Sequence, residues 1–132
     1  MANTLYNKAR ESFLSGGISW SGDTIKAVLV DTGTYTFSQS HQFLSSLSGT
    51  VGTAATLGTK TVTDGVADAA DVTYTAVSGA SVEAIVIYKD TGVAGPSPLI
   101  AYSDTATNLP VTPNGGDISI TWDSGANKIF KL

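Results

Sequence analysis

The sequence of 132 residues contains no cysteine, which excludes disulfides, thiolate metal ligands and thiol catalysis. Charge is also scarce: Asp, Glu, Lys and Arg make up 14% of the residues, with 11 acidic against 7 basic side chains. An acidic chain without a basic cluster cannot displace the counterions of a nucleic acid backbone, so we expect no nucleic-acid partner. No apolar run approaches the roughly 20 residues of a membrane helix, and we expect no membrane partner either.

The residues that are plentiful are small or β-branched, mostly Gly, Ala, Ser, Thr and Val. Such residues are poor helix formers and favour short strands separated by tight turns. Alternating apolar segments recur from Ile18 onwards, with turn signals about every 8 to 12 residues. The sequence therefore predicts one all-β domain, a two-sheet sandwich or jelly roll of about eight strands.

The first 17 residues have a different pattern. Leu5, Ala9 and Phe13 follow one another at helical spacing, Asn3 or Thr4 is a candidate N-cap, and Gly16-Gly17 ends the pattern. We expect a short amphipathic helix in residues 1–17, preceding a β domain in residues 18–132 of the same folding unit.

This helix has two interpretations. It covers one open end of the β core, or it forms an arm that docks on a neighbouring molecule. If the helix is an arm, we expect the β domain to remain folded after residues 1–16 are deleted. The candidate interface residues of the arm are its apolar side chains, Leu5, Tyr6, Ala9, Phe13 and Leu14.

The last segment alternates in the same way as the preceding strands. Ile118–Trp122 reads as a strand, Asp123–Asn127 as a turn and Lys128–Leu132 as a final strand, which together predict a hairpin. A terminal strand needs a partner in its own sheet or on another molecule. The candidate interface residues of this hairpin are Trp122, Ile129, Phe130 and Leu132.

Residues able to carry catalysis are few. His41 is the only histidine, no Gly-x-Ser-x-Gly nucleophile elbow occurs, and Glu11 and Glu83 are the only glutamates. The near-match to a phosphate loop around Lys60 lacks the required spacing. We expect no catalytic residue and no cofactor, and hence a protein that is not an enzyme.

Two further clusters have alternative readings. Asp64, Asp68 and Asp71 lack the spacing of an EF-hand, and Asp often bonds its own backbone in turns, so we predict no metal site and leave ion binding by these three open. The aromatic residues Trp20, Trp122, Tyr88 and Tyr102 either line a sugar-binding face or pack in the core of a sandwich.

Long stretches of the chain resemble a known family. The segments "LYNKARESFL", "DTIKAVLVDTGTYT" and "HQFLS" near the start, "GVADAADVTYTAVSGASVEAIVIYKDTG" in the middle and "LIAYSDTATNLPVTPNGGDISITWDSGANKIFKL" at the end carry the resemblance. They resemble small structural proteins of tailed bacteriophages, and specifically capsid cement (decoration) proteins.

The resemblance implies a role in the virion. Proteins of this kind sit on the outer surface of the capsid at local symmetry axes, are made in the host cytoplasm, and bind the major capsid protein and copies of themselves as a dimer or trimer. Two alternatives stay open. One is a tail-tube or connector component, for which 38–59 would be the long loop. The other is a carbohydrate-binding module of a fibre or adhesin, which needs an exposed aromatic platform.

Overall fold

A computed structural model of the chain describes residues 4–93, 95–104, 109–122 and 128–131. These residues form ten β-strands, one α-helix and one 3-10 turn, and every strand pairing is antiparallel. The expected all-β sandwich with a short N-terminal helix is confirmed. The elements are β1 (Thr4–Leu5), α1 (Asn7–Ser15), β2 (Ile25–Val30), η1 (Leu44–Ser46), β3 (Thr50–Thr56), β4 (Thr61–Thr63), β5 (Val66–Asp68), β6 (Val72–Tyr74), β7 (Ala84–Lys89), β8 (Leu99–Ser103), β9 (Ile118–Ile120) and β10 (Phe130–Lys131).

One layer of the sandwich is a five-stranded sheet in the order β1-β8-β7-β2-β3. Its central strands β2 and β7 are apolar on both faces, and nearly all of their residues are buried. A strand of this kind must be covered on both sides, because either face would otherwise expose a row of apolar side chains. The sheet therefore forms the middle of the molecule.

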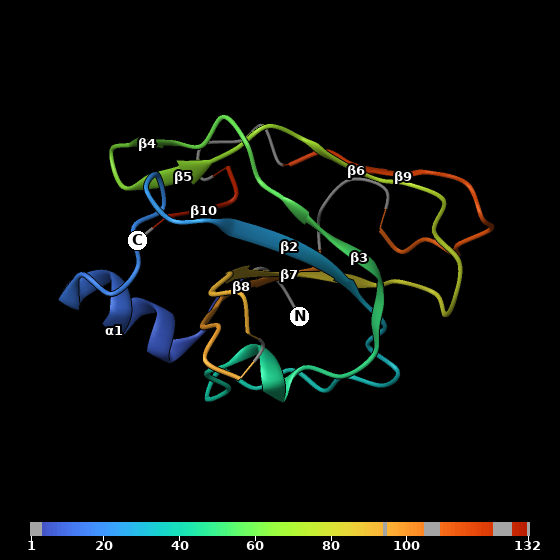
Figure 1. Ribbon diagram of the computed structural model, residues 1–132, viewed down its shortest axis with the longest axis horizontal. Helices are drawn as coiled ribbons and strands as arrows, with labels where there is room; N and C mark the ends of the chain where they lie inside the picture. The colour runs from blue at the N-terminus through green and yellow to red at the C-terminus, as the bar shows by residue number, and fades with distance from the viewer. Residues whose placement is uncertain (1–3, 94, 105–108, 123–127, 132) are drawn as a thin grey trace.

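The second layer consists of two small sheets, β10-β5-β4 and β6-β9, which lie above the five-stranded sheet in Figure 1. The buried side chains of Ile118, Ile120 and Tyr74 face the core from β9 and β6. Dividing this layer into short strands explains why the described residues form ten strands rather than about eight. Strands of two or three residues are too short to produce a recognisable alternation.

The opposite face of the five-stranded sheet is covered by the irregular segment 31–49, which contains η1 (Figure 1). Aromatic rings carry this contact: the centroids of Phe37 and Tyr102 are 4.6 Å apart, and those of Phe37 and Tyr6 are 5.2 Å apart. Tyr35 is buried beside them. Aromatic packing here takes the place of a regular third layer.

The N-terminal segment begins as a strand. Thr4 and Leu5 pair with Tyr102 and Ala101 of β8, so the expected cap at Asn3 or Thr4 is wrong and helix α1 starts only at Asn7. The pairing holds these two residues extended, which overrides their place in the helical pattern. At the other end, Gly16 adopts the left-handed conformation (φ 84°) that terminates the helix, as the glycine pair predicts. Helix α1 lies at one end of the sandwich (Figure 1).

The C-terminal strands do not pair with one another in the described residues, and the hairpin prediction is wrong there. β9 pairs with β6, whereas β10 pairs with β5 in the other small sheet. The aromatic ring of Phe130 explains the separation, because it packs against Trp20 and Phe13 at the helix end of the molecule. The expected turn Asp123–Asn127 and Leu132 lie outside the described residues.

Candidate interaction surfaces

The two tryptophans are core residues. Trp20 and Trp122 are 4% and 6% exposed. Each indole donates its Nε1–H to a backbone carbonyl of the same segment, Trp20 to Asp68 and Trp122 to Ala70, both at 3.0 Å. A buried indole satisfies its donor in this way, and neither ring is free to stack on a sugar.

The aspartates of the same segment have structural roles. Asp71 Oδ1 accepts the backbone N–H of Trp122 at 3.0 Å, and Asp64 occupies the turn between β4 and β5 with a positive φ of 53°. Asp tolerates that conformation better than most residues. In the part of the chain that the structure describes, no group of three or more His, Cys, Asp or Glu side chains is arranged to hold a metal ion.

His41 belongs to a short chain of hydrogen bonds. Its Nδ1 lies 2.8 Å from the hydroxyl of Tyr35, which lies 2.9 Å from the hydroxyl of Tyr6. Burial, helped by the bond to Tyr35, raises the pKa of Tyr6 far above its ordinary value, so this phenol stays neutral. These hydrogen bonds join the start of α1 to the segment below the sheet.

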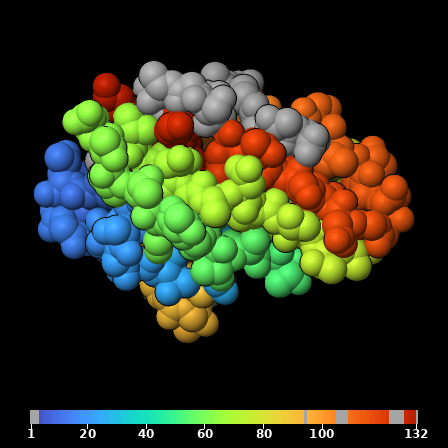
Figure 2. All heavy atoms as spheres, turned by 90° about the horizontal axis from the view of Figure 1, so that it is seen from above, coloured from blue at the N-terminus to red at the C-terminus, as the bar shows by residue number. Residues whose placement is uncertain are grey.

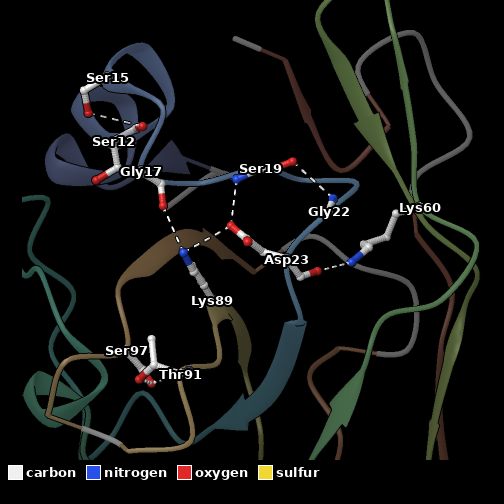
Figure 3. A network of polar contacts seen from close by, with 10 residues as sticks. All are labelled: Ser12, Ser15, Gly17, Ser19, Gly22, Asp23, Lys60, Lys89, Thr91 and Ser97. Atoms are coloured by element: carbon white, nitrogen blue, oxygen red, sulfur yellow. Dashed lines mark hydrogen bonds and ion pairs between the residues drawn. The ribbon is translucent and has the colours of Figure 1, made fainter.

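A polar network fastens the segment after the helix to the β body (Figure 3). Lys89 Nζ, at the end of β7, lies 3.0 Å from the carbonyl oxygen of Gly17 and 3.2 Å from Asp23 Oδ2. The same carboxylate accepts the backbone N–H of Ser19 at 2.7 Å, and Lys60 donates to the backbone carbonyl of Asp23. The bond from Ser19, followed by Lys89, lowers the pKa of Asp23.

The candidate interface residues of the N-terminal arm divide into inner and outer positions. Leu5, Tyr6 and Ala9 are buried in the chain's own core. Phe13 is half-buried, and its ring centroid is 5.7 Å from that of Phe130. Leu14 is 88% exposed. An intermolecular contact made by this segment would therefore centre on Leu14.

The candidate residues of the C-terminal segment lie inside the protein wherever they are described. Trp122, Ile129 and Phe130 are all buried. Phe130 meets Trp20 edge to face, with ring centroids 5.2 Å apart, a favourable geometry for two aromatic rings. The terminal strand thus finds its partner, β5, within the same chain.

Two exposed apolar residues were not selected from the sequence. Val62 on β4 is 57% exposed, and Val93 in the β7–β8 loop is 63% exposed. That loop projects from the body in Figure 2 (gold) and is held by Ser97, whose buried hydroxyl donates to the carbonyl of Val93 at 2.7 Å. In the described residues, Leu14, Val62 and Val93 are the large hydrophobic side chains left exposed.

These features define a small all-β sandwich whose polar clusters serve the fold and whose exposed apolar residues lie on three different elements. No protein-family model and no curated protein matches the chain. None of the helices within the described ranges has the length and apolar character needed to cross a membrane.

Proposed function

We propose that this chain is a structural protein of a bacteriophage virion, a cement protein that binds the outer surface of the capsid at local symmetry axes and stabilises the expanded head. The sequence resemblance described above supports this role. The structural observation that supports it most directly is that Leu14 on α1 and Val93 in the β7–β8 loop are exposed apolar side chains on separate elements of one body. Two such contacts on one rigid body would let it bridge neighbouring capsid subunits.

The rigidity of the body also supports the proposal. A shell that has expanded around packed DNA is under internal pressure, and a clamp resists it only if the clamp itself does not deform. Both faces of the five-stranded sheet are covered, and the network at Asp23 ties the helix end to β7. Closely packed interiors of this kind have low compressibility.

The two alternatives receive less support. A tail-tube or connector component would use 38–59 as a long loop, but this range contains η1 and most of its second half is strand β3. A carbohydrate-binding module would need an aromatic platform, and the indoles of Trp20 and Trp122 are buried. We therefore place the cement role first.

Co-sedimentation of the purified protein with expanded and unexpanded phage shells tests the proposal. Saturable binding to the expanded shells is expected, and its stoichiometry gives the copy number at each symmetry axis. Leu14→Ser and Val93→Ser should weaken binding without unfolding the protein, whereas the exposed polar change Thr73→Ser serves as a matched control. Absence of binding, with rings or tubes forming in solution, would contradict the cement role and favour a tail component.

A further inference from the structure

We propose that β4 is a self-association edge, at which two copies of the chain pair their β4 strands antiparallel around a two-fold axis passing through Val62. The three-stranded sheets of the two copies would then join into one continuous sheet in the order β10-β5-β4-β4-β5-β10. This inference goes beyond the cement role and does not depend on it.

The backbone of Val62 faces away from its own sheet. Val62 lies directly opposite Ala67 of β5, and the Ala67 carbonyl accepts the N–H of Ile129 at 3.1 Å on the β10 side. Residues directly opposite in an antiparallel ladder either bond to each other or both face outward. The N–H and C=O of Val62 therefore point to the outer side of β4, where no strand of the described residues pairs.

The adjoining turn independently indicates that the N–H and C=O of Val62 point outward. Thr63 and Val66 flank the two-residue turn Asp64-Gly65, whose φ values of 53° and 79° are those of a type I′ hairpin. The pair flanking such a turn is hydrogen-bonded, so the next pair, Val62 and Ala67, is not. Two observations thus assign the outward-facing position to Val62.

The sequence around Val62 is self-complementary. Residues 60–64 read Lys-Thr-Val-Thr-Asp, so antiparallel pairing centred on Val62 sets Thr61 opposite the second copy's Thr63, and paired threonines across strands are stabilising. The same pairing brings the second copy's Asp64, in the turn that follows its β4, towards the end of the strand where Lys60 lies. The opposite charges of these two side chains favour this register. The Lys60 ammonium donates one bond within its own chain, to the Asp23 carbonyl, and carries three N–H groups.

The side chains fit the same arrangement. All three β4 residues are exposed, and Val62 leaves more than half of its surface in water although it extends the row begun by the buried Ala67. A second Val62 beside it would cover both apolar side chains.

The contact is small, and its affinity should be low. Because so short a strand buries far less than the about 800 Å² per partner of a stable complex, we expect dissociation constants of about 0.1–1 mM in free solution. Copies held close together on a common surface would pair much more completely.

Cysteine cross-linking tests the pairing, because the chain has no cysteine of its own. Opposed residues in a hydrogen-bonded pair have Cα atoms about 5.5 Å apart, within the range of a disulfide. Under mild oxidation, Val62→Cys should form a covalent dimer at least about tenfold faster than Val93→Cys, its match in exposure. Equal rates for the two variants would overturn the proposal.

The register has its own cross-linking test. A mixture of Thr61→Cys and Thr63→Cys proteins should yield the mixed dimer in preference to either homodimer, since these positions face each other across the axis. A statistical mixture of the three dimers would overturn the register.

Sedimentation velocity at increasing concentration tests the noncovalent contact. The unmodified chain should associate reversibly, Val62→Lys should remain monomeric because like charges meet at the axis, and Val93→Lys should behave like the unmodified chain. Circular dichroism checks that each variant is folded. A chain that stays monomeric at all concentrations would refute the contact, and since no shell is used, this result is separate from the test of the cement role.

Discussion

The phenolic hydroxyl of Tyr74 on β6 donates a 2.8 Å hydrogen bond to the backbone carbonyl of Ala27 on β2, joining the two layers of the sandwich. Ala27 pairs with Ala55 of β3 and with Ile87 of β7, immediately before the shift of register towards Leu29. The side chain of one layer therefore bonds directly to the backbone of a central strand in the other.

Replacing Tyr74 by Phe should lower the free energy of unfolding by about 1–2 kcal/mol, because the buried hydrogen bond to Ala27 would be lost while the ring stays in place. Urea denaturation followed by tryptophan fluorescence measures the change. Tyr88→Phe is the matched control, since the Tyr88 hydroxyl bonds to no residue in the described ranges. Equal losses in both variants would contradict a specific role of the Tyr74–Ala27 bond.

The Asp23 carboxylate should make stability depend on acid pH. Its pKa in the folded state is lowered from 3.8, chiefly by the Ser19 N–H and then by Lys89. Because the unfolded chain binds this proton more tightly, the contribution is complete above the unfolded pKa and is lost as the pH falls below 3.8 through the folded pKa. Unfolding by urea at several pH values should show this loss in the unmodified chain and a flatter profile in Asp23→Asn.

Phe130→Ala should destabilise the fold by about 3 kcal/mol, because the ring is buried against Trp20 and Phe13 and its removal leaves a cavity. Thermal or urea unfolding gives the value. Lys131→Ala, at the exposed neighbouring position, should change stability by less than about 0.5 kcal/mol. A similarly small loss for Phe130→Ala would mean that the ring does not occupy the core.

Deletion of residues 1–16 should unfold the protein or destabilise it strongly. This reverses the expectation from the sequence, because Leu5, Tyr6 and Ala9 are part of the core and β1 pairs with β8. Loss of the cooperative unfolding transition would be the result to look for by circular dichroism. Leu14→Ala, which truncates the exposed face of the same helix, should leave stability unchanged within about 0.5 kcal/mol.

Regular alternation of apolar residues and the position of glycine predicted the long strands and the end of the helix correctly. β2 and β7 are long enough to show which residues alternate, and Gly16 marks the helix end because few residues other than glycine adopt its backbone conformation readily. Each of these features depends on the conformation of a few neighbouring residues, so the local sequence is enough to predict it.

Local sequence did not predict which of the candidate interface residues are exposed, because the exposure of a side chain depends on residues far away in the chain. Phe130 and Trp122 lie in a segment that reads as a terminal hairpin, yet their side chains are buried in the core formed by other segments. Val62 stands in an ordinary alternating strand, and only the sheet order β10-β5-β4 leaves it at an edge. Val62 therefore remains in contact with water because β4 is the last strand of its sheet.

The sequence by itself determined an acidic, cysteine-free, all-β chain with a short helix near its start, because composition and short-range periodicity are enough to select strands, turns and helix ends. The tertiary structure alone decided that Thr4–Leu5 joins the main sheet, that β9 and β10 enter different sheets, and that β4 ends one of them. The physical reason is that strand pairing and the burial of aromatic rings depend on residues far apart in the chain. Burying a large apolar side chain contributes roughly 1.5–3 kcal/mol, which outweighs local propensities of about a few tenths of a kcal/mol per residue.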